Sequence, residues 1–334
     1  MIEPATSLSL KDIEKTPLHS VIEYYIHYYA SGSSHTAKAK QLDLQHFLNF
    51  LQSLKGYSKV EKLKLADWDH ASVQRFVEDS LNHGEAPTSV ARRLATLKHM
   101  GRTLSERFPG FINPAREVKS PKLRALVPKA LEPDEIKAIR EKAQIRLKEK
   151  SSFNRLRNQV LFDFMLDTGL RADEVRLLKL SQIDPDLEWI QSVRTKGKQY
   201  RNVYITSSMR PRLKKYLEAR SQQLKRFYAK LSNAQDKALP LFISTYNANA
   251  SDPGSFLMGA KSIWRAINEL SRGTGLHPHL LRHSYAIDLL KSTNDVRLVA
   301  QALGHSDVRI TMRYTERAQE DIAKALEKAR RRNP

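Results

Sequence analysis

Four side chains that could handle a phosphate group lie within residues 277–315 of the 334-residue sequence. His279 and Arg282 are three positions apart, a spacing that places two side chains on one face of a helix, where they could hold one anion together. His305 and Tyr314 follow after an amphipathic stretch. The segment therefore predicts a phosphate-handling site near the C-terminus.

Two helices are predicted around His305. Gly304 is expected to end the first helix, and Ser306 is placed to cap the second. His305 therefore lies at a helix junction, and Tyr314 lies on a short helix just beyond it. Apolar or packing residues mark both helices: Val296, Val299 and Leu303 on the first, Val308 and Thr311 on the second.

The order of these residues resembles a known family. His279-x-x-Arg282, then Leu-Gly-His305-Ser, then a tyrosine nine positions after that histidine is similar to the C-terminal box of the tyrosine recombinases, the phage integrases and Xer-type enzymes. A single histidine, arginine or tyrosine on a helix is usually structural. The ordered motifs become specific for the family when its other active-site residues are also present upstream.

An arginine motif is present upstream. A buried helix over residues 156–165 is expected to stop at Gly169, and the sequence TGLR then ends in Arg171. An arginine held at such a junction can make two parallel hydrogen bonds to a phosphate, and Glu174, one turn later, could orient its guanidinium. TGLR followed by an acidic residue three positions on resembles the family's first arginine motif, although alone the pair would be an ordinary surface ion pair.

A β-hairpin with lysine at its tip follows. Residues 189–194 and 200–206 alternate as strands do, and Lys196-Gly197-Lys198 forms the turn between them. The resemblance implies that Lys196 is the family's catalytic lysine, with Lys198 as the nearby competitor. Turn lysines are usually only solvated, so the resemblance carries this assignment.

Composition indicates the partner. The formal net charge is +21 with a pI near 10.0, which favours binding to a polyanion such as DNA. Cysteine is absent, which excludes disulfides and suits a reducing compartment. No apolar run reaches the roughly 18 residues of a membrane span, and no signal pattern opens the chain. We expect a cytoplasmic, nucleoid-associated protein with no membrane partner.

Residues 1–113 are expected to form a helical domain similar to the family's core-binding domain. Helices are predicted over residues 18–30 and 34–54, after the capping residue Asp69, and after Pro87. The aromatic stripe of the first helix favours core packing over base stacking. Basic residues of the fourth helix and the following segment are candidate DNA contacts, with a solvated surface as the alternative: Arg92, Arg93, Lys98, Arg102, Lys119, Lys122 and Arg124.

The remaining chain is divided by composition. Residues 114–129, rich in proline and basic residues, are predicted to be an extended linker along a phosphate backbone, or a basic spacer that touches nothing. Residues 130–319 are the predicted catalytic domain, which includes a long basic helix over 208–232. Residues 320–334 form a tail helix whose apolar stripe docks in a neighbour or folds back on its own domain. The expected fold is mainly α with a small β-hairpin, an α+β class.

The resemblance implies a chemistry without metal, cofactor or ATP. Tyr314 would attack the scissile phosphate and form a 3′-phosphotyrosyl link. Arg171 and Arg282 would clamp the nonbridging oxygens, and Lys196 would protonate the leaving 5′-oxygen. His279 and His305 would add hydrogen bonds, with His279 the preferred partner for the tyrosine proton. Glu174 would support Arg171.

These roles imply site-specific DNA recombination on paired half-sites of duplex DNA. A homotetramer is expected on DNA, and a monomer or dimer when the protein is free. The alternatives are a type IB topoisomerase, a telomere-resolving enzyme and a DNA-binding regulator without catalysis. His277-Pro278-His279 has the spacing of a relaxase metal site, but no acidic set accompanies it, so no metal site is predicted.

Overall fold

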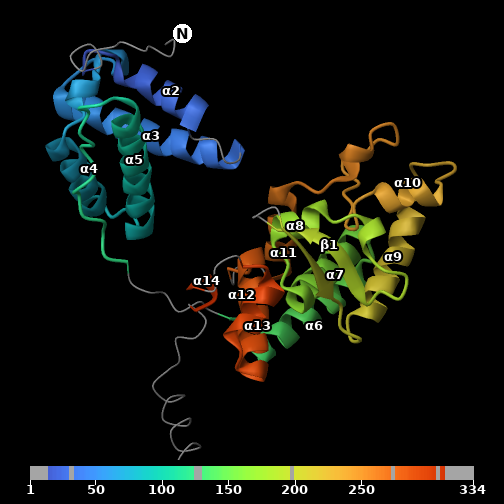
Figure 1. Cartoon of the computed structure of the whole chain (residues 1–334). Helices are drawn as coiled ribbons and strands as arrows, with labels where there is room; N and C mark the ends of the chain where they lie inside the picture. The colour runs from blue at the N-terminus through green and yellow to red at the C-terminus, as the bar shows by residue number, and fades with distance from the viewer. Residues whose placement is uncertain are drawn as a thin grey trace, which may run out of the picture. The chain divides into compact units, whose positions relative to one another are not determined.

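The chain divides into two compact units, Met1–Ala125 and Leu126–Pro334. The structure is a computed structural model, and it describes residues 14–29, 34–123, 130–195, 199–271, 275–305 and 309–312. Helices dominate these ranges, and the strands within them form one two-stranded sheet (Figure 1). The predicted class, mainly helical with a small β-hairpin, is confirmed.

The first unit is built from helices α2 to α5, as the sequence predicted (Figure 1). Asp69 caps α4, because its carboxylate accepts a hydrogen bond from the Ser72 backbone N–H at 2.7 Å. Pro87 is the first residue of α5, where its missing N–H costs nothing. The bounds are α2 Leu18–Tyr29, α3 Ser34–Lys55, α4 His70–Asn82 and α5 Pro87–Arg107.

Aromatic side chains fill the centre of the first unit. Phe47 packs edge-on against Phe76, with ring centroids 5.3 Å apart, and Trp68 also packs edge-on against Phe47. Tyr25 of α2 is fully buried, and its hydroxyl is hydrogen-bonded to His99 Nδ1 at 2.8 Å. The aromatic face of α2 therefore packs in the core, as predicted.

The beginning of the predicted linker belongs to this core. Ala115 and Val118 are buried with the apolar side chains of the first unit, and the Asn113 amide donates to the Lys98 carbonyl of α5 at 3.0 Å. The prediction of an extended chain from residue 114 is therefore wrong for its first five residues. Proline excludes a helix there, but turns still allow two small apolar side chains to reach the core.

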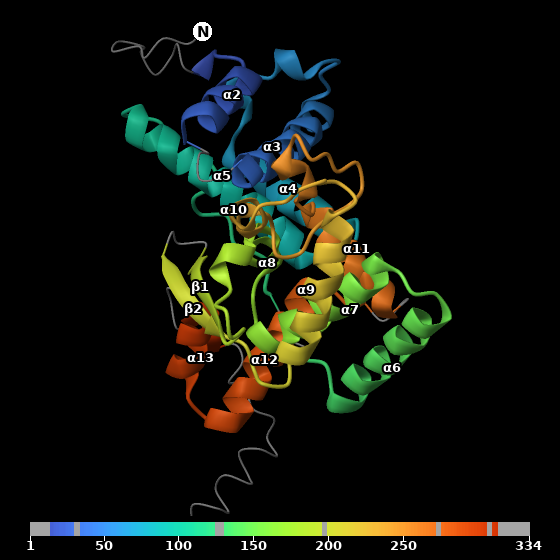
Figure 2. The same cartoon turned by 90° about the vertical axis from the view of Figure 1, so that its right-hand side faces the viewer.

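The second unit holds the remaining helices and the hairpin (Figures 1 and 2). No helix within the described ranges is both long and apolar enough to cross a membrane. The bounds are α6 Pro133–Glu149, α7 Phe153–Thr168, α8 Ala172–Leu177, β1 Trp189–Arg194, β2 Tyr200–Tyr204, α9 Arg210–Leu224, α10 Asn233–Ala238, α11 Ala260–Ser271, α12 Pro278–Thr293, α13 Val296–Leu303 and α14 Arg309–Met312.

Helix α7 is the central element of this unit. It contacts α6, α9, α11 and α12 (Figure 1), and apolar side chains such as Leu161 and Phe164 are fully buried. The helix ends at Gly169, which has φ +62°, a conformation that favours glycine. A Cβ at this position would lie within 2.9 Å of three atoms of the Tyr285 ring. Gly169 is therefore required both for the turn and for close packing against α12.

Strands β1 and β2 form the predicted antiparallel hairpin. Val193 is paired with Arg201, and the pairing is irregular between Ile190 and Val193. The Gln182 side chain donates to the two backbone carbonyls within this irregular stretch, which stabilises it. The Thr195 N–H donates to the Gln199 carbonyl at 2.8 Å and closes the hairpin on either side of residues 196–198.

The predicted long helix over residues 208–232 is shorter than expected. Helix α9 ends at Leu224, and α10 starts after Ser232, whose hydroxyl accepts from the Gln235 N–H. Between them, Tyr228 stacks on Phe256 with ring centroids 5.7 Å apart. The packing of these aromatic rings and a strong helix-start signal at Ser232 end the helix where charge periodicity alone would continue it.

Candidate active site

A buried carboxylate lies among three arginines in the second unit. Glu174 Oε1 accepts hydrogen bonds from Arg171 Nη1 at 2.8 Å and Arg201 Nη1 at 3.2 Å. Oε2 accepts from Arg201 Nη2 at 3.0 Å and from the Arg171 backbone N–H at 2.9 Å. Arg282 Nη1 lies 3.8 Å from Oε2. Helix α8, strand β2 and helix α12 thus meet at one side chain.

The charge of Glu174 is maintained by its partners. Burial acts to raise the pKa of this carboxyl, but the hydrogen bonds and charge of Arg201, and then of Arg171, outweigh burial and lower the pKa. Removing an ion from water costs several kcal/mol, whereas each hydrogen bond to a charged group contributes about 1.5–3 kcal/mol. With four such bonds, pairing exceeds desolvation and Glu174 stays ionised.

Arg171 is the accessible member of the cluster. It directly precedes α8, and the turn at Gly169 positions it after the buried helix α7. Its side chain is 26% exposed, so the guanidinium is held by Glu174 on one side and reaches the surface on the other. The predicted support of Arg171 by Glu174 is present in the structure.

Arg282 is buried beneath this surface, with its side chain 5% exposed. Nη1 donates to the Gly169 carbonyl at 2.8 Å, and Nη2 donates to the Leu303 carbonyl at 2.7 Å. These carbonyls end helices α7 and α13, where the helix dipoles are negative. Arg282 therefore connects two helix C-termini and brings positive charge beneath Glu174 and Arg171.

His305 lies next to Arg282, at the helix junction that the sequence predicted. Its Nε2 is 3.1 Å from Arg282 Nη2, and its Nδ1 is 2.7 Å from the hydroxyl of Thr311. An arginine can only donate, so Nε2 must accept, and the ring proton is then on Nδ1 and is donated to Thr311. The structure thus assigns the neutral Nδ1–H tautomer to His305 and connects it to α14.

His279 is an exposed side chain near the N-terminus of α12. Partial burial, and then the positive surroundings of His277, Arg282 and Arg171, lower its pKa. His277 itself caps α12, because its Nδ1 accepts from the Leu280 backbone N–H at 3.2 Å. The lowered pKa keeps His279 neutral at pH 7, a state in which a ring nitrogen can accept a proton.

Two predicted catalytic residues, Lys196 and Tyr314, lie outside the described residues, as does the candidate DNA contact Arg124. Of the rest, Arg171, Glu174, Arg282 and His305 are joined by hydrogen bonds or ion pairs, whereas His279 is related to them through charge. In the part of the chain that the structure describes, no three His, Cys, Asp or Glu side chains cluster in a way that could hold a metal ion.

The candidate DNA contacts of the first unit differ in accessibility. Arg102, Lys119 and Lys122 are exposed or partly exposed, and Lys98 is half-buried. Arg92 keeps much of its side chain in solvent but forms an ion pair with the buried Asp43. Arg93 is buried and paired with Glu85, which leaves little of its guanidinium available to a partner: the helical pattern had placed it away from the core.

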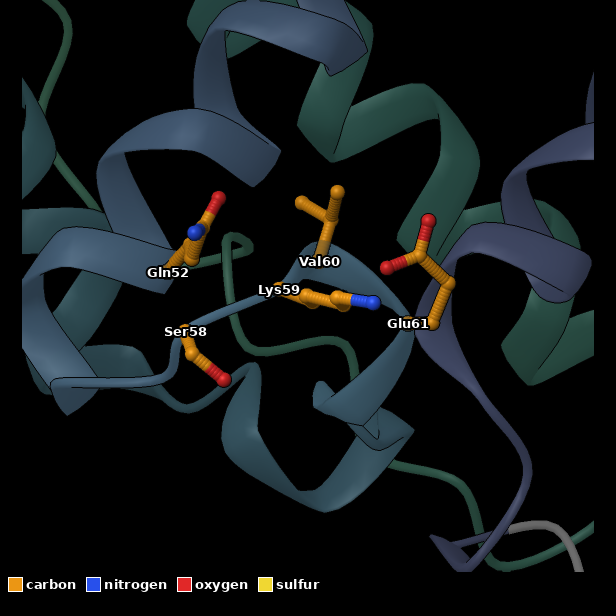
Figure 3. A pocket seen from close by; sticks show the side chains of 5 residues that line it. All are labelled: Gln52, Ser58, Lys59, Val60 and Glu61. Carbon is orange, nitrogen blue, oxygen red and sulfur yellow. The ribbon is translucent and has the colours of Figure 1, made fainter.

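A hollow of about 600 Å³ lies elsewhere, in the first unit. Figure 3 shows its lining side chains, which come from α3, from the loop that follows it and from the 3₁₀ turn at Val60–Lys62. Lys59 is its single lining cation and Glu61 lies close by in sequence, so the hollow offers no surplus of positive charge. Its lining consists of Gln52, Ser58, Lys59, Val60 and Glu61.

Sequence reasoning missed two residues of the site, Arg201 and Thr311. Arg201 shares the inward face of β2 with the buried Val203, so a charged residue at an inward strand position was the available signal. Thr311 is fully buried six positions after His305, and its role could not be distinguished from packing without the three-dimensional contact.

The arginine cluster and its two histidines, in a mainly helical domain, form a site whose positive charge suits an anion such as a phosphate. Residues 129–321 match the phage integrase family, and residues 22–107 match the phage integrase N-terminal SAM-like domain. Tyrosine recombinase XerC of Thermodesulfovibrio yellowstonii is 30% identical over 85% of this chain and 86% of that protein. The chain belongs to the phage integrase family: it is a tyrosine recombinase, an enzyme of site-specific recombination that cleaves and rejoins DNA strands.

Solved structures share the fold. XerH recombinase bound to palindromic difH substrate has a TM-score of 0.62 and 17% identity, and the match covers 91% of this chain and 83% of that chain. The Tn1549 transposon integrase in complex with transposon right end DNA has a TM-score of 0.65 and 14% identity, with 93% and 98% covered. The curated relatives also include tyrosine recombinase XerD of Listeria monocytogenes, 26% identical over 89% of this chain and 94% of that protein.

We predict that the hydroxyl of Thr311 stabilises the fold by accepting a hydrogen bond from His305 Nδ1. Thr311→Val keeps the shape of the side chain but leaves the Nδ1–H without its acceptor, so the free energy of unfolding should fall by about 1–3 kcal/mol. Urea denaturation measures this loss, and ¹⁵N NMR of the histidine rings reports the tautomer. Thr311→Ser is the matched control and should retain both. A valine variant as stable as wild type would contradict this hydrogen bond, whereas its ring tautomer should stay Nδ1–H because Arg282 still donates to Nε2.

The lowered pKa of His279 predicts the acidic limit of DNA cleavage. Since the pKa lies below its ordinary value of 6.5, the ring is neutral at pH 7 and becomes protonated only as the pH falls through this lowered value. The rate of covalent adduct formation on cleavable DNA should therefore decline with a midpoint below pH 6.5. In His279→Gln the rate should be lower and this acidic decline should disappear; a decline that persists unchanged would assign it to another group.

Proposed function

We propose that this tyrosine recombinase cleaves DNA through a 3′-phosphotyrosyl intermediate, without metal or ATP. The oxygen of Tyr314 forms a bond to the scissile phosphorus, and the bond from phosphorus to the 5′-oxygen breaks. The tyrosine proton goes to His279, and Lys196 supplies a proton to the leaving oxygen. Rejoining reverses these transfers, so the covalent link conserves the phosphodiester.

The observation that carries this proposal is the arginine cluster around Glu174. Three guanidinium groups surround one carboxylate, so the cluster keeps a surplus of positive charge where a transferring phosphoryl group gains negative charge. Arg171, the exposed member, makes the direct contact with the nonbridging oxygens. Arg282 contributes its charge from beneath and sets the position of His305.

The substrate is duplex DNA that carries paired half-sites. XerH recombinase is bound to a palindromic substrate in its structure, and lambda integrase is bound as a dimer to a core site. Exchange between two such sites requires four active centres, so a homotetramer on DNA is the proposed working assembly. The net charge of +21 supports binding to the phosphate backbone.

The two units divide these tasks. The first unit, including residues 114–118, supplies the core-binding domain, and the basic linker is reduced to residues 119–129. Arg92, Lys98, Arg102, Lys119, Lys122 and Arg124 are proposed to contact DNA, whereas Arg93 stabilises the fold through its buried pair with Glu85. Residues 130–319 form the catalytic domain, and residues 320–334 the tail proposed to be exchanged between protomers.

The nucleophile is tested by a covalent trap. Protein-linked ends captured from genomic fragments of the source organism give the cleavage site, and a nicked duplex built on that sequence prevents rejoining. Tyr314→Phe should bind this duplex normally and form no adduct, and the wild-type adduct should form in EDTA. An adduct in the phenylalanine variant would overturn the assignment, and a strict Mg²⁺ requirement would refute the metal-free mechanism.

The proton donor is tested by the leaving group. Lys196→Ala should form little adduct on ordinary DNA but recover on a duplex with sulfur at the bridging 5′ position, because a thiolate leaves without a proton. Lys198→Ala is the matched control and should behave as wild type on both substrates. If Lys198→Ala, and not Lys196→Ala, loses the adduct on ordinary DNA and regains it on the sulfur-containing duplex, Lys198 is the proton donor.

A further inference from the structure

Arg201 is a charged residue that the proposed cleavage reaction does not use. It is located on β2, two positions after the residue that closes the hairpin, and its side chain is directed toward the interior with 11% of its surface exposed. Both of its terminal nitrogens donate to Glu174, one to each carboxylate oxygen, at 3.2 and 3.0 Å. This two-point contact is the strongest geometry available to an arginine and a carboxylate.

The Arg201 side chain is held on its other side by Gly304. A Cβ at Gly304 would lie 2.7 Å from Arg201 Nη1 and 3.1 Å from its Cδ, and the residue has φ +63°. Figure 2 shows the hairpin next to α13, the helix that Gly304 ends. Arg201 therefore fills the space between the Glu174 carboxylate and the turn that precedes His305.

The position of Arg201 determines how the charge of Glu174 is shared. Without Arg201, the cations paired with this buried carboxylate among the described residues would be Arg171 and Arg282, the two arginines assigned to the scissile phosphate. A carboxylate and a phosphate would then compete for the same guanidinium groups. With Arg201 bound at two points, the carboxylate is satisfied by a residue that has no contact role with DNA in the proposed reaction.

We infer that Arg201 is a positioning residue of the recombinase: it neutralises Glu174, so that Arg171 and Arg282 keep their positive charge for the scissile phosphate. This inference rests on the proposed role of the two arginines. It assigns to the hairpin a second task besides carrying Lys196, because the strand that follows the lysine also sets the charge of the clamp.

The substitutions separate charge from shape. Arg201→Gln removes the charge, and Arg201→Lys keeps the charge but not the two-point contact. At saturating DNA, we expect adduct formation by Arg201→Gln to be about 100-fold slower than wild type, as for loss of one transition-state donor, and Arg201→Lys to retain more than roughly a tenth of the wild-type rate. Arg194→Gln removes one exposed charge from the same hairpin and is the matched control, with an unchanged rate.

Two further measurements identify the mechanism. In the background of Glu174→Gln no carboxylate remains to be neutralised, so the Arg201→Gln defect should shrink by about tenfold or more. A methylphosphonate at the scissile position removes the negative charge that the clamp must hold, so the defect should also shrink there. Sulfur at the bridging 5′ position should not reduce the defect, because the lost function is not proton donation.

The outcomes are separable from those that test the cleavage reaction itself. Wild type must form the adduct and Tyr314→Phe must not, which tests the reaction before Arg201 is considered. Thermal unfolding and DNA binding show which variants fold. If Arg201→Gln does not fold, Arg201→Lys and the Glu174→Gln/Arg201→Gln double variant are compared instead. The double variant should fold because it leaves no buried charge without a partner. Two results would overturn the inference. One is a defect of Arg201→Gln, or of the double variant, that is equally large on ordinary DNA and on methylphosphonate DNA. The other is an Arg201→Lys variant that is as slow as a folded Arg201→Gln variant.

Discussion

The ionised state of the buried Glu174 carboxylate is the constraint on which the site depends. A carboxylate with so little exposure is stable only when its hydrogen bonds outweigh desolvation, and Arg201 and Arg171 provide them. The same bonds place α8 against β2, so electrostatic pairing and the position of the hairpin cannot be separated. Substituting one of the arginines paired with Glu174 should therefore change the cleavage rate and the stability together. Substituting both Glu174 and that arginine should restore stability before it restores the rate.

A second set of contacts extends from this carboxylate to α14. Arg282 lies 3.8 Å from Glu174, donates to the ends of α7 and α13, and donates to His305. His305 in turn donates to Thr311 on α14. Each step has a fixed direction of donation, because an arginine cannot accept and the histidine has one ring proton in its neutral form. A change at the arginine cluster therefore has a continuous polar route to the segment that precedes Tyr314.

Much of this arrangement could be predicted from the sequence, because local signals determine it. Asp69, Gly169 and Gly304 end or begin helices by capping rules that need no tertiary information, and alternation identified the hairpin. The resemblance to tyrosine recombinases joined residues 171 and 282 across more than a hundred positions. The roles of Arg201 and Thr311, the burial of Arg93 and the packing of Val118 were missed, because each depends on a partner distant in sequence or on which side of an element faces the core.

The distribution of arginines shows how a strongly basic chain avoids internal repulsion. Arg93 and Arg282 are buried and the Arg201 side chain is 11% exposed, and each has a carboxylate or helix-end carbonyls as its partner. Exposed cations such as Lys119 have no such constraint and can contribute to a salt-dependent attraction for phosphates. Net charge thus predicts the partner, whereas the ion pairs of individual arginines determine how each guanidinium is oriented. Arg171 belongs to both groups, since Glu174 fixes one side of its guanidinium and solvent reaches the other, so this guanidinium is both oriented by a carboxylate and accessible from the surface.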